Sequence, residues 1–172
     1  MPQRLPPPPG GMIPLDHQPE LFAAFNQYYG VLWSRGVVDQ ASKEAGRLRN
    51  ARVTGCKLCQ SLRFGGAVEA GLTEDLVDLI VDGHQESGLP ERLKLVLRWA
   101  DALIVDPHGI DDALRADVLD EWTPEQVVEL TMTITSAMGF SKAAVALGPP
   151  PSMDVMLVPT PEPGGSVVNP FA

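Results

Sequence analysis

Apolar residues recur at three- and four-residue spacing through most of this chain, and no stretch alternates apolar and polar residues as a strand does. Local start signals support the helices: Thr73 offers a side-chain cap, and Thr123 with Gln126 forms a capping box. The sequence therefore predicts an all-α fold. We expect about seven helices, near residues 19–35, 38–54, 56–70, 73–80, 90–105, 114–122 and 123–147.

Proline and glycine concentrate at the two ends. Because proline removes an amide donor and clashes with the preceding turn, residues 1–14 are expected to form an extended arm outside the helices. Residues 15–148 would form one helical domain. Residues 149–172 would form a tail that is either disordered or, given apolar Val155 to Val158, packed along its own or a neighbouring subunit.

Composition limits the class of protein. A chain of 172 residues with 44% hydrophobic content can bury one sizeable core. The 22 acidic and 13 basic residues leave a formal net charge of -9, which disfavours a nucleic-acid surface. Since no apolar run reaches about 20 residues and the start lacks a secretory pattern, we expect no membrane association and a cytoplasmic location.

The two cysteines of the chain, Cys56 and Cys59, stand one helical turn apart at the start of an apolar helical pattern. In a reducing compartment, two close cysteines are more often catalytic or metal-binding than a permanent staple, because so small a loop stabilises little. Reversible disulfide formation is the simplest chemistry for this pair. A metal half-site and two inert buried thiols are the other interpretations.

The sequence does not offer the residues that a zinc site, a covalent haem or a thioredoxin domain would need. His17, His84 and His108 are scattered, without zinc-ligand spacing around the cysteines, and each is expected to be a loop or capping residue. His84 follows the short fourth helix and is the one of the three able to approach the site. Gln60 rather than histidine follows the second cysteine, which disfavours covalent haem. A thioredoxin domain would need a strand before its cysteines, whereas a basic helix precedes Cys56. We expect no metal and no other cofactor.

The order Glu44, eleven residues, then Cys56-Lys57-Leu58-Cys59 at the head of a helix resembles the alkylhydroperoxidase D (AhpD) and carboxymuconolactone decarboxylase superfamily. The resemblance is closest to the peroxidase-related members and covers roughly residues 15–147. It implies an all-helical AhpD-like fold, assembly as trimers or hexamers, and reduction of small hydroperoxides without haem or flavin. An external thiol or dithiol would then restore the reduced enzyme.

The resemblance also implies roles for the site residues. Cys59 would be the peroxidatic thiol, Cys56 would resolve its sulfenic acid and present the disulfide to the reductant, and Glu44 would be the base. The positive end of the helix dipole alone would favour Cys56 as the nucleophile, so the order of roles rests on the resemblance.

Two positions depart from the family pattern, and one is Leu58, where the family often has histidine or tyrosine. AhpD has a histidine four residues after the second cysteine that relays a proton, and this chain has Arg63 there. Arginine stays charged at working pH, so it cannot relay a proton. On a continuous helix Arg63 would share a face with both cysteines and would stabilise a thiolate or an anionic substrate. We therefore expect a supporting electrostatic role for it.

Other functions fit the same pattern less well. A carboxymuconolactone decarboxylase-like lyase would use general acid and base groups and would not need the thiols. A non-enzymatic oligomeric scaffold would keep the fold alone. Glu44 would then form an ion pair with a neighbouring Lys or Arg side chain. A solvated or subunit-contact face is expected for Arg47, Arg49 and Arg52, and one of these arginines would steady Glu44.

Overall fold

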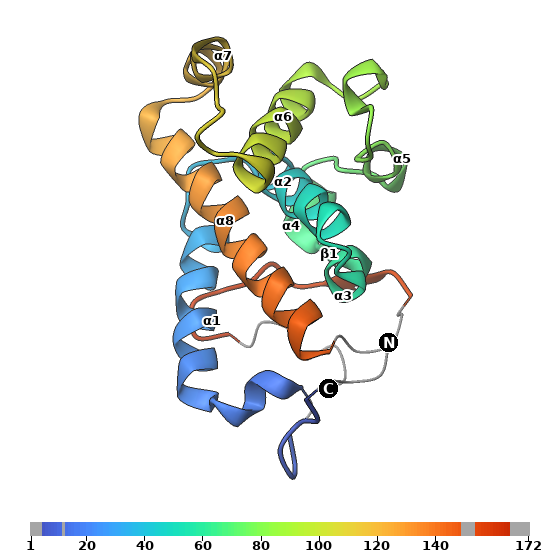
Figure 1. Cartoon of the computed structure of the whole chain (residues 1–172), viewed down its shortest axis with the longest axis vertical. Helices are drawn as coiled ribbons and strands as arrows, with labels where there is room; N and C mark the ends of the chain where they lie inside the picture. Colours follow the sequence, from blue (N-terminus) through green and yellow to red (C-terminus); the bar gives the residue numbers. More distant parts are fainter. Residues whose placement is uncertain (1–4, 12, 149–153, 166–172) are drawn as a thin grey trace.

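A computed structural model describes residues 5–11, 13–148 and 154–165 of the chain (Figure 1). Within these residues the fold is helical, as predicted, with eight α-helices and two short strands. The elements in order are η1 (Pro14–His17), α1 (Pro19–Ser34), α2 (Gln40–Val53), α3 (Lys57–Ser61), β1 (Leu62–Phe64), α4 (Gly65–Glu69), α5 (Glu74–Asp78), η2 (His84–Glu86), α6 (Glu91–Val105), α7 (Asp112–Glu121), α8 (Pro124–Leu147) and β2 (Met156–Val158).

Helix α2 is the centre of the fold. It packs against α8 and α6, and also against α3 and α4 (Figure 1). Asp39 caps its start by accepting a 2.8 Å hydrogen bond from the Ser42 amide. Gly46 lies where α2 meets α8: a Cβ there would come within 2.8 Å of the Ile134 side chain, so glycine permits the close approach. All residues from 42 to 51 are buried.

The burial of α2 corrects one expectation. Arg47 and Arg49 are buried at 4% and 7% exposure, whereas the sequence indicated a solvated or subunit-contact face. A charged side chain is buried at low cost only when it is paired. Lys43 accordingly pairs with Glu129, Arg49 with Asp101, and Arg47 with Glu44.

The predicted third helix is divided into three elements. The helix after Cys56 ends at Ser61, residues 62–64 form β1, and α4 follows from Gly65. Strand β1 pairs in parallel with β2 of the tail, so that Phe64 lies beside Val158. The described part of the tail therefore packs on its own chain. The predicted arm and tail include residues 1–4, 12, 149–153 and 166–172, which lie outside the described residues.

The apolar side chains gather in three clusters. The main core joins α2, α5, α6, α7 and α8. A second, aromatic cluster holds Tyr29 and Trp33 of α1 together with Phe64 of β1 and Val158 of β2. The third surrounds the two cysteines. Helix α8 has the length and composition of a membrane span, but the core helix of a globular protein can have both as well. Here α8 packs against α1, α2, α6 and α7.

Candidate active site

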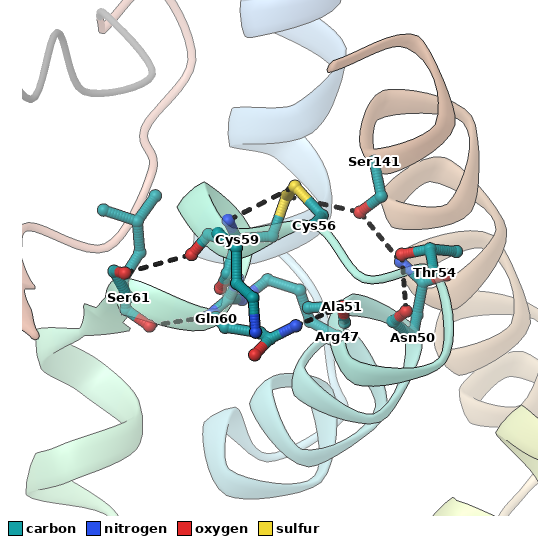
Figure 2. The surroundings of a disulfide bond; sticks show 11 residues. Arg47, Asn50, Ala51, Thr54, Cys56, Cys59, Gln60, Ser61 and Ser141 are labelled. Carbon is teal, nitrogen blue, oxygen red and sulfur yellow. Dashed lines mark hydrogen bonds between the residues drawn. A yellow bond between two sulfur atoms is a disulfide. The ribbon is translucent and has the colours of Figure 1, made fainter. Parts of the chain in front are cut away.

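Cys56 and Cys59 form a disulfide at the start of α3, with their Cα atoms 5.3 Å apart (Figure 2). Gly55, with a φ of 69°, takes the left-handed conformation that turns the chain from α2 into α3. Cys56 is the N-cap of α3, and its Sγ accepts a 3.4 Å hydrogen bond from the Cys59 amide. The turn between two helices thus brings both sulfur atoms into bonding distance.

The two sulfur atoms differ in their surroundings. Cys56 is completely buried, whereas Cys59 is 6% exposed and lines a small cavity of about 30 Å³. That volume takes a group about the size of a water molecule or slightly larger. The cavity is lined by residues of α1, α2, α3, β1 and α8: Phe25, Tyr29, Arg47, Leu58, Cys59, Leu62, Phe64, Ala137, Phe140 and Ser141.

Two polar side chains reach Cys59 from neighbouring helices. The Ser141 hydroxyl of α8 donates to Cys59 Sγ at 3.3 Å, and Asn50 Nδ2 of α2 donates to the same hydroxyl oxygen at 3.0 Å (Figure 2). Because Asn50 uses the oxygen as an acceptor, the serine proton points to the sulfur. Ser141 would therefore donate to a Cys59 thiolate once the disulfide is reduced.

Glu44 and Arg47 form a buried ion pair on α2, and Arg47 but not Glu44 lines the cavity at Cys59. Arg47 Nε and Nη2 each donate a 2.7 Å hydrogen bond to the Glu44 carboxylate, which also accepts one from the Phe64 amide at 3.3 Å. The same guanidinium donates to the carbonyl oxygens of Cys59 at 2.6 Å and Leu62 at 2.7 Å. Arg47 thus fixes the carboxylate and the end of the cysteine helix together.

Burial and charge set the protonation of this site. Burial lowers the pKa of Arg47, but the Glu44 carboxylate outweighs it, so the pKa is raised and the cation persists. Burial raises the pKa of Tyr29 to about 12, although the Arg47 charge acts in the opposite direction. At neutral pH the cavity therefore holds a neutral phenol and a paired cation.

Arg63 does not share a face with the cysteines, because the helix ends at Ser61 and Arg63 lies in β1. Its guanidinium pairs with Glu74 through bonds of 2.7 and 3.0 Å and donates to the Gln60 carbonyl at 2.6 Å. The geometric premise for its electrostatic role is therefore wrong. Arg47, which lines the cavity itself, is the cation beside Cys59.

His84 is buried in a different cluster. Its Nε2 lies 3.0 Å from Asp101 Oδ2, and Asp101 also accepts from Arg49. It does not line the cavity at Cys59, although it was the one histidine that the sequence placed within reach of the site. Among residues 5–11, 13–148 and 154–165, no group of three or more His, Cys, Asp or Glu side chains is placed to hold a metal ion.

Sequence reasoning missed Ser141, Asn50 and Tyr29. Ser141 and Asn50 are 91 residues apart, and neither stands at a recognisable spacing from the cysteines. Tyr29 packs in the aromatic cluster with Trp33 and Phe64, and it also lines the cavity. For Arg47 the sequence did hold a signal: it stands three residues after Glu44, and residues at that spacing meet on a helix.

Comparison with known proteins places the chain. The model of the carboxymuconolactone decarboxylase family matches residues 19–116. Uncharacterised proteins from two strains of Mycobacterium tuberculosis are 34% identical over 139 residues, which is 80% of this chain and 49% of each relative. The chain thus spans about half the length of the curated relatives it matches.

A solved structure shows the same fold. It is a protein of unknown function from Agrobacterium tumefaciens, described as a candidate antioxidant defence protein AhpD. The match has a TM-score of 0.67 at 20% identity and covers 81% of this chain and 97% of that one. With an AhpD-like fold and a family match over more than half its length, the chain belongs to the carboxymuconolactone decarboxylase family.

Proposed function

We propose that this protein is a dithiol peroxidase that reduces organic hydroperoxides through Cys59 and Cys56. One observation carries the proposal: the two cysteines form a disulfide, and Cys59 faces a small cavity that also holds the Arg47 guanidinium and the Ser141 hydroxyl. A redox couple beside a site for a small polar group fits peroxide reduction. The fold of the A. tumefaciens protein is consistent with it.

The cycle has two steps in the protein. The Cys59 thiolate attacks the terminal peroxide oxygen, the O–O bond breaks, and the alkoxide leaves as alcohol after taking a proton. The Cys56 thiol then attacks the Cys59 sulfenic acid, forming the disulfide and releasing water. The hydroperoxide is reduced by two electrons and the dithiol is oxidised by two. An external thiol or dithiol returns the pair to the reduced form.

The environments of the sulfur atoms support Cys59 as the attacking thiol. It lines the cavity and accepts from Ser141, whereas Cys56 is fully buried behind it. These contacts outweigh the helix-dipole argument that favours Cys56. The same exposures favour entry of the reductant from the Cys59 side, rather than at Cys56 as the family resemblance implies.

Glu44 and Arg47 act as a pair in this proposal. Glu44 does not line the cavity at Cys59, so it accepts the thiol proton through water, while Arg47 holds the carboxylate in place. Arg47 also supplies positive charge to the cavity in which the alkoxide forms. No proton relay through Arg63 is involved, since that guanidinium is engaged by Glu74.

The lyase alternative is disfavoured by the size of the cavity. A lactone with carboxylate groups does not fit a space of about 30 Å³, and the larger neighbouring space has an apolar lining. The scaffold alternative predicts thiols no more reactive than free cysteine.

In solution we expect a trimer or hexamer, and a monomeric mass by light scattering would contradict this.

The test follows both thiols through one turnover. Reduced protein receives one equivalent of an organic hydroperoxide, and thiol content and intact mass are measured over time for wild type, Cys59→Ser and Cys56→Ser. We expect rapid loss of both thiols and a mass decrease of about 2 Da in wild type. Cys56→Ser should stop at a sulfenic acid on Cys59, and Cys59→Ser should react slowly. Thiols that oxidise no faster than free cysteine would exclude the peroxidase.

A further inference from the structure

A second, much larger cavity of about 610 Å³ lies between the N-terminal segment, α1 and α8. In Figure 1 the blue N-terminal segment lies at the foot of α1, and it is tied to the end of α8 by a hydrogen bond from the Leu5 amide to the Leu147 carbonyl. We call this cavity the apolar groove. Its lining includes Leu15, Leu21, Phe22, Ala143 and Leu147.

The groove offers a ligand few polar partners, and the Gln18 side chain is one of them. The Tyr28 hydroxyl is bonded to Ser136 at 2.9 Å, and because Ser136 donates to the Met132 carbonyl, Tyr28 is the donor. His17 is bonded to the Pro6 carbonyl at 3.0 Å. Among the described residues, the lining contains no Lys, Arg, Asp or Glu. Its volume is typical of a small-molecule site, and its chemistry favours a hydrocarbon.

The apolar groove and the cavity at Cys59 share two residues. Phe25 of α1 and Phe140 of α8 line both spaces, and their rings stack with centroids 5.3 Å apart. The cavity at Cys59 accommodates only a group the size of a peroxide. Any larger substrate must therefore keep the rest of its structure outside that cavity, and the adjoining apolar space is the groove.

We propose that the apolar groove binds the hydrocarbon chain of a long-chain alkyl hydroperoxide while its peroxide group reaches Cys59. The identity of the reacting group rests on the proposed function, whereas the hydrocarbon site rests on the groove itself. The groove therefore sets specificity: a long chain buries apolar surface there and reacts faster at low concentration, whereas hydrogen peroxide gains nothing from it.

Gly139 provides a direct way to fill the groove. It lies in α8 on the groove wall, and a Cβ added there meets no atom within 4 Å. Since glycine is unfavourable inside a helix, Gly139→Phe and the matched control Gly139→Ala should both keep the fold. The phenylalanine ring would occupy the groove, whereas the alanine methyl would leave most of it open.

The first measurement compares dodecyl hydroperoxide with hydrogen peroxide as oxidants of the reduced protein. We expect wild type and Gly139→Ala to prefer dodecyl hydroperoxide, and Gly139→Phe to lose about tenfold or more of that rate constant while its hydrogen peroxide rate stays within about twofold. Equal rate constants for the two peroxides in wild type, or equal losses for both in Gly139→Phe, would overturn the proposal.

The second measurement does not depend on redox activity. Dodecanol, the alcohol product of that peroxide, is titrated into the disulfide form by calorimetry. Dodecanol binding to wild type and Gly139→Ala but not to Gly139→Phe supports the groove as a hydrocarbon site. This result stands even if no peroxide reacts, in which case only the proposed peroxidase function has failed. Thiol oxidation without dodecanol binding would overturn the groove and leave the peroxidase standing. A second result would also overturn the groove as a hydrocarbon site. If light scattering shows that Gly139→Phe dissociates an oligomer while dodecanol binding is unchanged, the groove is a contact between copies of this chain.

Discussion

Arg47 holds the Glu44 carboxylate with two hydrogen bonds of 2.7 Å, and both side chains are buried, at 4% and 0% exposure. The pair stands on α2, three residues apart, and Arg47 extends from it to the carbonyl oxygen of Cys59. The carboxylate that we propose as the base is therefore also part of the structure that holds the cysteine helix. Any variant at Glu44 changes both properties.

We expect Glu44→Gln to destabilise the protein by about 3 to 5 kcal/mol, because it leaves the Arg47 cation buried without its counter-charge. Urea unfolding measures the loss. The matched control is Asp117→Asn, which removes the partner of Arg98: the two side chains are 51% and 38% exposed, so the cost should stay below about 1 kcal/mol. Equal stabilities for wild type and Glu44→Gln would contradict this structural role. Thiol oxidation by Glu44→Gln is informative only under conditions where it is folded.

Local signals predicted much of the fold. Thr73 caps α5, Thr123 and Gln126 form the capping box of α8, and Pro19 begins α1, as expected. Each of these features depends on residues within one helical turn, so a sequence displays them directly. The Cys56 and Cys59 spacing predicted a pair able to form a disulfide for the same reason.

Features that depend on distant residues were not predictable. Strand β1 interrupts the expected cysteine helix because it pairs with β2, whose residues lie 94 positions later in the chain. That pairing moved Arg63 away from the helix face on which its role was based. Ser141 reaches Cys59 because α8 packs on α2, a contact that no local spacing records.

Ser141→Ala should raise the pKa of the Cys59 thiol in the reduced protein, because the thiolate loses a charge-assisted hydrogen bond. A bond of this type is worth about 1.5 to 3 kcal/mol, so peroxide reduction at neutral pH should slow by about one order of magnitude. Thiolate absorbance against pH, measured in a Cys56→Ser background, reports the shift.

The control for Ser141 is Thr135→Ala on the same helix. Thr135 donates to the Thr131 carbonyl of its own helix, and it lines neither the cavity at Cys59 nor the apolar groove. Its thiolate titration should match wild type. An unchanged titration in Ser141→Ala would show that the hydroxyl packs against the sulfur without stabilising the thiolate.

Asp39 links the stability of α2 to pH. Burial raises the pKa of Asp39, but hydrogen bonds from the Ser42 amide and hydroxyl and the nearby Arg92 lower it, and the net shift is below the usual 3.8. A carboxyl with a lowered folded pKa contributes stability above its unfolded pKa, and this is lost as pH falls through the folded value.

Two substitutions separate the cap from the charge of Asp39. Asn is also a good N-cap, so Asp39→Asn should keep most of the cap yet lose less stability than wild type between about pH 5 and pH 2. Asp39→Ala should cost about 1 kcal/mol at neutral pH through loss of the cap. Urea midpoints across this range test both, and parallel acid profiles for wild type and Asp39→Asn would refute the linkage.

Tyr29 should make the protein sensitive to alkali. Its pKa is about 12 in the folded state against 10.0 for the free phenol, because burial disfavours the phenolate. The stability from this shift is complete below about pH 10 and is lost as pH rises toward 12, by up to about 3 kcal/mol. Tyr29→Phe cannot ionise, so its unfolding free energy should fall less than that of wild type over the same range. Unfolding followed by urea at each pH gives the comparison, and equal declines would mean that the phenol ionises in the folded site.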